Sequence, residues 1–177
     1  MIHEPPAAGS LLRNIAMTTA LLAAVAAVAS LKAGATVNEA LFLKTEAAHL
    51  QSEASDQWAY YQAKGIKASV QEATRTSWLA AGKEAPASLE ETIKRYGEEQ
   101  KEIADKANEK EKERDVKAHE ADELLHSHHR FANSVALMQI AIALGAVAAL
   151  TRQRTMWLAS LGVGVIGSAL FALTLLH

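Results

Sequence analysis

The hydrophobic and polar positions divide the chain into three apolar segments and one long charged stretch. The segment 11–31 carries a single charge, Arg13, near its start, and the segments 131–150 and 156–176 contain no Asp, Glu, Lys or Arg. Each approaches the roughly 20 residues that a helix needs to cross a bilayer. The sequence therefore predicts an all-α membrane protein. It begins with an N-terminal tail at 1–10 and has three transmembrane helices, at 11–35, 131–151 and 155–176.

The first apolar segment has a second interpretation, a cleavable signal peptide. Arg13 would be its basic start, the apolar run its core, and Ala27-Val28-Ala29 an Ala-x-Ala cleavage site. Both interpretations place the N-terminus in the cytoplasm. We expect the membrane helix.

The charged stretch 32–130 holds 19 of the 20 acidic and 15 of the 18 basic residues, which gives it a local net charge of −4. One break interrupts it, Gly82-Lys83-Glu84-Ala85-Pro86, and Ser88-x-x-Glu91 follows as a capping-box pattern. The arms on either side are similar in length and would each reach roughly 65 Å as helices. We expect a long antiparallel helical hairpin outside the bilayer, a coiled-coil-like stalk over 36–130 with its turn at 82–87.

Each arm has an apolar seam. In the first arm alanine recurs every seven residues, with Tyr61 in the one missing place, at Ala33, Ala40, Ala47, Ala54 and Ala68. Small residues at this spacing suit a closely approached helix pair. The second arm has a rougher seam at Leu89, Ile93, Tyr96, Ile103, Ala107, Ala121 and Leu124. This apolar surface is thin for an isolated hairpin, so we expect association with further helices.

Small residues also recur four apart in the apolar segments. They are Ala16, Ala20 and Ala24, then Ala141, Gly145 and Ala149, then Ser160, Gly164, Ser168 and Ala172. Such faces let helices approach closely in lipid, either within the chain or between chains. The string Gly162-x-Gly164-x-x-Gly167 matches a dinucleotide-binding fingerprint, but it lies inside an apolar run with no preceding strand, so we interpret it as chance.

Two stretches together resemble a known family. They are Ala54-Ser55-Asp56-Gln57-Trp58-Ala59-Tyr60-Tyr61-Gln62-Ala63-Lys64, and 131–154 with its Gln139-Ile140-Ala141-Ile142-Ala143 core. The chain resembles, from Arg13 to Leu176, the bacterial membrane family known as domain of unknown function 4337. The resemblance implies a bacterial inner-membrane protein with the same three-helix plan, and it implies no activity.

Three aromatic residues, Trp58, Tyr60 and Tyr61, lie near the middle of the first arm. They fill a local core or form an exposed contact surface, since Trp and Tyr are favoured interface residues. Trp58 and Tyr61 can share a helix face, whereas Tyr60 points well away from Trp58. A single second helix cannot cover all three, which predicts a protein contact at this cluster.

A pair of Glu-x-x-His motifs provides a candidate metal site. Glu46 and His49 lie on the first arm, and Glu123 and His126 on the second. Residues three apart share a helix face, and di-iron carboxylate bundles use two such motifs with further glutamates. Folding about the turn is expected to bring Glu46 near Asp122 and His49 near His119. These groups could hold iron, manganese or zinc, or the histidines could be interfacial anchors.

The remaining composition excludes several function classes. The absence of cysteine excludes disulfides, thiolate metal sites and cysteine nucleophiles. There is no basic stripe interleaved with aromatics, which disfavours nucleic acid, and no Ser/His/Asp order or phosphate loop, which disfavours an enzyme. We expect a non-enzymatic membrane scaffold or accessory subunit without a cofactor, in contact with the lipid bilayer and assembled as a homo-oligomer or within a larger membrane complex. The alternative is a metal-binding, di-iron-like redox protein.

The distribution of basic residues predicts an orientation. Arg13 precedes the first membrane segment, and Arg152 and Arg154 lie in the short turn between the other two. By the positive-inside rule these charges place the N-terminus and the short turn in the cytoplasm and the stalk in the periplasm. Basic residues near the stalk base favour the opposite orientation, namely Lys32, Lys44, Lys117 and Arg130.

Overall fold

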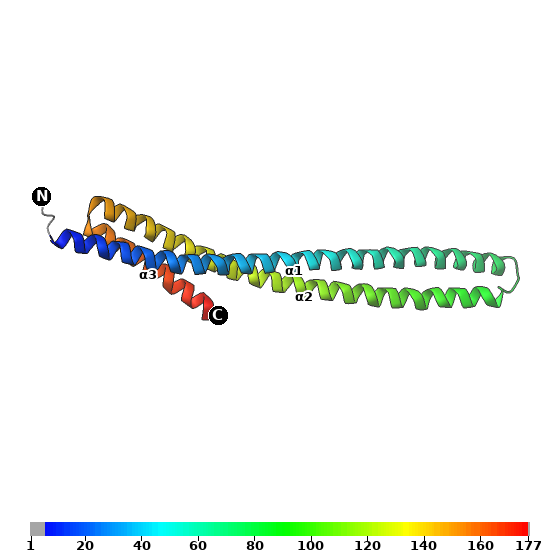
Figure 1. Ribbon diagram of the computed structural model, residues 1–177. Helices are drawn as coiled ribbons and strands as arrows, with labels where there is room; N and C mark the ends of the chain where they lie inside the picture. The colour runs from blue at the N-terminus through cyan, green and yellow to red at the C-terminus, as the bar shows by residue number, and fades with distance from the viewer. Residues whose placement is uncertain (1–5, 177) are drawn as a thin grey trace. The chain divides into compact units, whose positions relative to one another are not determined.

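The computed structural model describes residues 6–176, which form three helices joined by two short connections. They are α1 (Pro6–Ala80), α2 (Ala87–Thr151) and α3 (Arg154–Leu176), as Figure 1 shows. Each contains a stretch that is long and apolar enough to cross a membrane. The all-α prediction is confirmed.

Each of the two long helices contains an apolar segment and a charged arm with no break between them. In α1 the apolar segment comes first, and in α2 the charged arm comes first. The predicted tail at 1–10 differs in its second half, because α1 already begins at Pro6. Proline is well suited to a first helical position, since its fixed φ matches the helix and the missing N–H has no partner there. Residues 1–5 of that tail lie outside the described residues.

The chain divides into two compact units, Met1–Leu41 with Ala121–His177 and Phe42–Glu120. We call the described part of the first, residues 6–41 and 121–176, the bundle unit. We call Phe42–Glu120 the hairpin unit.

The turn of the hairpin unit is set by Gly82. Its φ of 69° is a left-handed conformation that glycine adopts without strain. Its N–H donates to the carbonyl of Leu79 at 3.0 Å, and the N–H of Lys83 donates to that of Trp78 at 3.1 Å. These two bonds form a Schellman motif, which satisfies the last carbonyls of α1 and ends the helix.

The start of α2 differs from the prediction. The carbonyl of Pro86 accepts the N–H groups of Leu89 and Glu90, so Pro86 is the N-cap residue. Ser88 therefore lies inside the helix, and the predicted capping box at Ser88 is wrong. The break itself lies where the glycine and proline indicated it.

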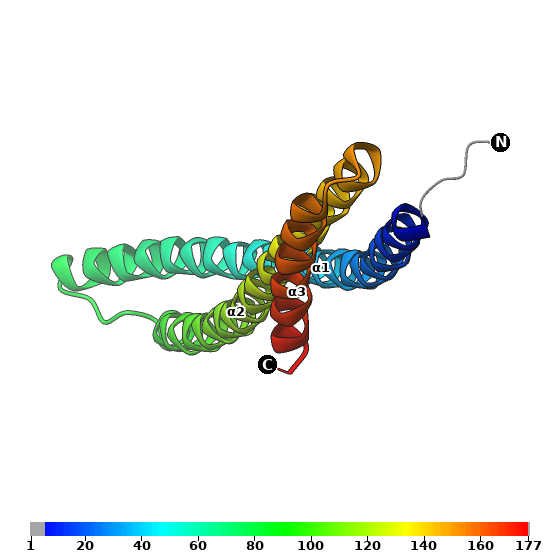
Figure 2. The same cartoon turned by 90° about the vertical axis from the view of Figure 1, so that its left-hand side faces the viewer.

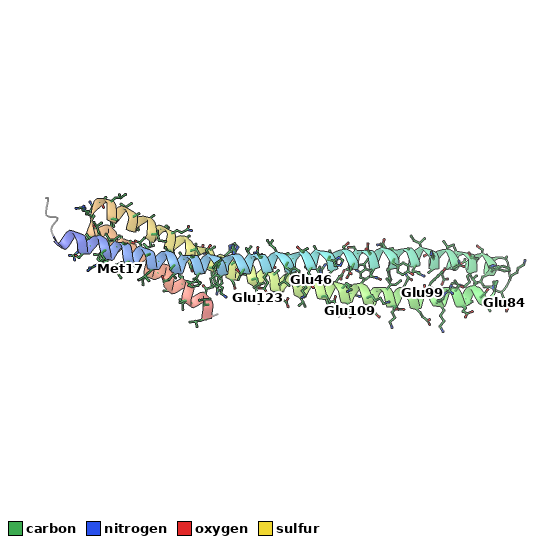
Figure 3. The ribbon with its side chains drawn as sticks, viewed as in Figure 1. Met17, Glu46, Glu84, Glu99, Glu109 and Glu123 are labelled. Carbon is green, nitrogen blue, oxygen red and sulfur yellow. The ribbon has the colours of Figure 1, made fainter. Side chains whose placement is uncertain are left out.

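The arms of the hairpin unit run antiparallel. Lys117 Nζ lies 3.4 Å from Glu46 Oε2 near one end, and Arg75 Nη1 lies 3.5 Å from Glu90 Oε2 near the turn. Figure 3 shows charged side chains along both arms. Between the arms lie the predicted seam residues, with Ala54 and Ala107 fully buried and Ile103 6% exposed. The alanine seam is confirmed in this unit.

The bundle unit packs parts of all three helices around one core. Ala29, Phe131, Met138 and Phe171 belong to that core, and the rings of Phe131 and Phe171 are 5.8 Å apart. Figures 1 and 2 show α3 folding back along the last part of α2, where Ser160 Oγ donates to the carbonyl of Ala141 at 2.7 Å. The apolar segments therefore pack against one another.

The small residues expected at the helix contacts are used only in part. On α3 the buried positions are Ser160, Gly164, Gly167 and Phe171, so the predicted face at Ser168 and Ala172 is displaced. The 3.6-residue period explains this, because a buried face alternates between steps of three and four. On α1 the predicted small face at Ala16, Ala20 and Ala24 is exposed. That face is free to meet lipid or other helices.

Candidate functional site

The aromatic cluster in the hairpin unit is partly internal. Trp58 is half-buried, and its indole N–H donates to Glu111 Oε1 on α2 at 2.9 Å. Its ring meets that of Tyr61 edge to face, with centroids 5.6 Å apart. Tyr60, in contrast, is 51% exposed. Trp58 and Tyr61 therefore pack within the hairpin while Tyr60 faces outward, and a protein contact at this cluster stays a prediction.

Next to this cluster, Lys64 joins the two arms. It forms an ion pair with Glu99, and its Nζ lies 5.3 Å from the centroid of the Tyr60 ring and 5.4 Å from that of Tyr96. The hydrogen bond to the Glu99 carboxylate, with a smaller contribution from Tyr60, raises the pKa of the Lys64 ammonium above its usual range. The Lys64 side chain is only 14% exposed, so this ion pair is well covered.

Gly65 lets the arms approach closely beside Lys64. Gln100 lies across α1 there, and its Nε2 donates to the carbonyl of Tyr61 at 3.3 Å. A Cβ at Gly65 would lie 2.7 Å from that nitrogen. The sequence reasoning missed Lys64, Gly65, Glu99 and Gln100. The available signal was a glycine and a lysine directly after the aromatic cluster, opposite a seam that already contained Tyr96.

The candidate metal residues have other partners or are exposed. Glu46 pairs with Lys117, five residues before the Asp122 that we expected beside it. His49 is 73% exposed, with its Nε2 3.6 Å from Glu53. Both belong to the hairpin unit, whereas Glu123 and His126 belong to the bundle unit and are exposed there.

Within residues 6–176, no group of three or more His, Asp or Glu side chains is arranged to hold a metal ion. Among the histidines near the second apolar segment, His128 has a structural contact. Its Nδ1 lies 2.9 Å from the carbonyl of Ala33, which connects α2 to α1 within the bundle unit. His128 therefore helps to hold the two helices together through this polar contact.

We predict less than about one iron, manganese or zinc per purified chain, because the motif residues lack the convergent donors that such metals need. The variants Glu46→Ala and His126→Ala should fold like the parent, since an exposed ion pair is worth only about 0–1 kcal/mol. Elemental analysis of the full-length protein and of both variants tests this. Stoichiometric metal in the parent that is lost in both variants would establish the metal-binding alternative.

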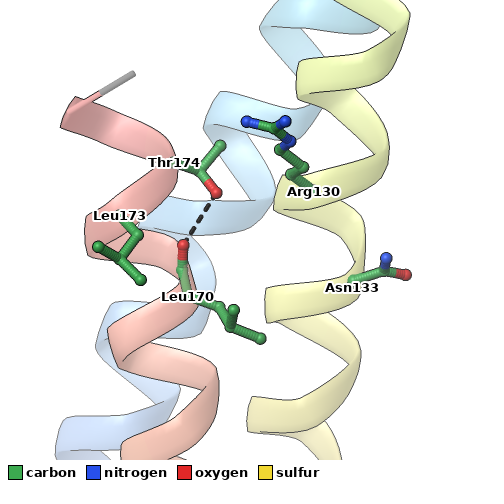
Figure 4. A pocket seen from close by; sticks show the side chains of 5 residues that line it. All are labelled: Arg130, Asn133, Leu170, Leu173 and Thr174. Atoms are coloured by element: carbon green, nitrogen blue, oxygen red, sulfur yellow. Dashed lines mark hydrogen bonds between the residues drawn. The ribbon is translucent and has the colours of Figure 1, made fainter.

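A pocket of about 270 Å³ opens between α2 and α3 of the bundle unit. Figure 4 shows Arg130 on α2 with its guanidinium between the helices, opposite Leu170 and Thr174 of α3. The Thr174 hydroxyl is already used, since it donates to the carbonyl of Leu170 at 2.8 Å. Leucine side chains with one cation at their edge form a surface that suits a lipid.

The family described as Domain of unknown function (DUF4337) matches residues 11–177. The chain belongs to this family. The resemblance predicted from the sequence is confirmed, and the match includes parts of both units. Comparison with curated proteins and with solved structures gives no match.

The two stretches that carried the resemblance to DUF4337 have distinct structural roles. Residues 54–64 contain the half-buried Trp58 and the ion-paired Lys64 of the hairpin unit. Residues 131–154 contain Met138 and Ala141, which are fully buried in the bundle unit. One stretch thus holds the hairpin together and the other holds the helix bundle together.

Proposed function

We propose that the chain is a non-enzymatic membrane scaffold or accessory subunit. In this proposal the bundle unit spans a bacterial inner membrane with three transmembrane helices, and the hairpin unit is a stalk outside the bilayer that assembles with other proteins. The observation that carries it is the coexistence of two surfaces in one chain. Long exposed apolar helices suit lipid, and a charged hairpin with exposed aromatic and aliphatic residues suits a protein partner.

The surface of the bundle unit supports membrane insertion. Large apolar side chains that would be costly in water are exposed on all three helices, among them Leu21 at 66%, Leu150 at 87% and Val165 at 67%. A water-soluble monomer rarely exposes so much contiguous apolar surface. Lipid is the solvent that removes this cost.

The internal packing of the bundle unit supports one consistent orientation. Trp157 Nε1 donates to Thr18 Oγ1 at 3.2 Å, so the start of α3 and the start of α1 lie at the same end. That end carries Arg13 and Arg154, which would both face the cytoplasm. The hairpin would then be periplasmic.

We predict that alkaline phosphatase fused at Gly82 is active, because this enzyme needs the oxidising periplasm to form its disulfides. A fusion at Gln153, in the short turn, is the matched control and should be inactive. Activity measured in whole cells at equal expression tests the orientation. The reverse pattern at the two positions would place the hairpin in the cytoplasm.

The hairpin unit supports assembly through its exposed apolar residues. Of the three predicted contact residues, Tyr60 is the most accessible, while Trp58 donates a hydrogen bond to Glu111 on α2 and packs edge to face against Tyr61. The small residues exposed on α1 of the bundle unit, including Ala16 and Ala20, offer a second contact within the membrane. A stalk and a membrane face that both favour helix contacts are typical of a subunit in a complex.

The test is the mass of the full-length protein extracted in mild detergent, followed by mass spectrometry of the chains present. We expect a stable assembly of more than one chain in fixed proportion. Tyr60→Ala should weaken this assembly more than Trp78→Ala, because Trp78 is 38% exposed and lies beside the turn. A monomer without any stoichiometric partner would refute the proposed function.

A further inference from the structure

The outer side of α1 in the hairpin unit carries a second, exposed seam. It runs from Thr45 to Ser77 in steps of three or four residues, and its central members are Ser52, Ser55, Ala59, Ala63, Ile66 and Val70. All of these side chains are exposed, with Ile66 at 67% and Val70 at 57%. We call this row the outer stripe. Steps of three and four keep its members on one face of the helix.

The outer stripe contains no charged residue, in contrast to the other arm. In α2, 19 of the residues 87–120 are Asp, Glu, Lys or Arg, so its outer face is charged along its whole length. The exposed large apolar residues of the hairpin unit follow the same division. Only Val116 lies on α2, and the others lie on α1, namely Phe42, Tyr60, Ile66, Val70, Trp78 and Leu79. The outer face of α2 is therefore solvated by charged side chains, whereas the outer stripe of α1 is not.

An uncharged face is what a helix needs in order to pair with its own copy. Two chains inserted the same way in one membrane both enter their hairpins through α1 from the same side of the bilayer, so we take two α1 arms in contact to run parallel. At a parallel two-fold contact in register each residue meets the same residue of its partner, and a charge there would meet a like charge. The outer stripe has no charge along its length, so no like charges would meet there. The charged outer face of α2 would bring like charges together in the same arrangement.

The residues of the outer stripe also suit such a contact in shape and area. Alanine and serine allow close approach, and Ile66 and Val70 add larger apolar side chains that gain from burial. The stripe spans 33 residues, or about 50 Å of helix. With a contact about 10 Å wide, two copies bury about 1,000 Å² in total, which reaches the size expected of a specific interface.

We propose that the outer stripe of α1 pairs with the outer stripe of a second copy of this chain, parallel and in register, so that two hairpins form a four-helix bundle. This inference rests on the proposed function, since membrane anchoring makes the two hairpins parallel. It identifies the partner as the chain itself and the contact as the face opposite the internal alanine seam. The α1 helices are then central and the charged α2 helices are on the outside.

Cysteine crosslinking of the full-length protein in native membranes tests the contact, because the chain contains no cysteine. Ala59→Cys and Ile66→Cys are expected to form intermolecular disulfides, since residues near a two-fold axis bring their Cα atoms within the roughly 4.4–6.8 Å that a disulfide needs. Val116→Cys is the matched control on α2, with an exposure of 56% against 67% for Ile66. Ser69→Cys is the control on α1, because Ser69 is exposed and lies about 80° around the helix from the centre line of the outer stripe.

A charge introduced into the outer stripe provides the second measurement. Ile66→Glu would place two carboxylates against each other and should lower the dimer fraction in mild detergent by about tenfold or more, whereas Val116→Glu should not. Helix content by circular dichroism should be equal in both variants, because both positions are exposed.

The outcomes separate this inference from the proposed function. Disulfides at Ala59 and Ile66 with weak crosslinking at Ser69 and Val116 would support it. Equal crosslinking at all four positions would overturn it, since that pattern indicates random collision. No crosslinking at the stripe in a protein that still purifies as a stoichiometric assembly would overturn the self-contact and leave the proposed function standing. A monomer in every measurement would refute both.

Discussion

Gly167→Leu is expected to disrupt the helix bundle, because α3 packs directly against the backbone of α2 at this buried glycine. A Cβ added at Gly167 would lie 3.1 Å from Leu137 Cβ and 3.2 Å from the backbone nitrogen of Met138. A backbone atom cannot turn aside as the end of a side chain can, so α3 would have to move away from α2. Overpacking of this kind costs about 3 kcal/mol for a residue as large as leucine.

Gly162 provides the matched control on the same helix. It is exposed, and a Cβ there meets nothing within 4 Å. Gly162→Leu should be neutral or slightly stabilising, since leucine is the better helix former by roughly 1 kcal/mol. Thermal unfolding of the purified full-length protein in detergent measures the difference. We expect Gly167→Leu to lower the midpoint by about 6–12 °C relative to Gly162→Leu. Equal midpoints would show that the close approach at Gly167 is absent.

These two glycines belong to the string that resembles a dinucleotide fingerprint, and their structure supports the interpretation of that string as chance. Both lie within α3, where Gly167 is buried against α2 and Gly162 is exposed. The sequence alone predicted a small-residue contact on this helix, but it assigned Ser168 and Ala172 to it. A four-residue repeat drifts around a helix of 3.6 residues per turn, so only the neighbouring helices decide which small residues are buried.

The hairpin shows the same balance between what sequence predicts and what packing decides. A seven-residue alanine repeat indicates a close helix pair, and Ala47 and Ala54 in the hairpin are buried as expected. The partners across the hairpin were predicted less well. Glu46 meets Lys117 rather than a residue near Asp122, a difference of about one helical turn along α2. In arms with so many Glu and Lys side chains, several registers offer ion pairs, and the turn geometry selects among them.

The candidate site was predictable as a region and not as a set of contacts. Aromatic residues at 58, 60 and 61 indicated a packing or contact cluster, and the structure packs Trp58 within the hairpin and leaves Tyr60 exposed. Nothing in the spacing indicated that Glu111 accepts the Trp58 N–H, because that bond depends on the same register. The functional interpretation therefore rests on the exposed apolar and uncharged helix faces. These faces can be recognised from the residue types along each side of a helix.

The second large effect is expected in the alanine seam of the hairpin, at Ala107. This residue is fully buried, whereas its neighbour Asn108 is exposed. Ala107→Glu would place a carboxylate between the arms. The nearest cations are already engaged, Lys106 with Glu102 at 2.7 Å and Lys110 with Glu53 at 3.2 Å. An unpaired charge in such a seam costs about 3 kcal/mol, because it must be desolvated or the arms must separate.

Limited proteolysis of the full-length protein measures this separation, since trypsin can cut at Lys106 or Lys110 only when the hairpin opens. A cost of about 3 kcal/mol raises the open population by about a hundredfold, and cleavage follows that population when opening is fast. Asn108→Glu introduces the same side chain one residue away on the solvated face of α2 and should change cleavage by less than about threefold. Ala107→Gln separates charge from size, because glutamine has the shape of glutamate without its charge. If Ala107→Glu and Asn108→Glu are cleaved at equal rates, the arms do not pack at Ala107. If Ala107→Gln is cleaved as fast as Ala107→Glu, the effect comes from side-chain volume alone.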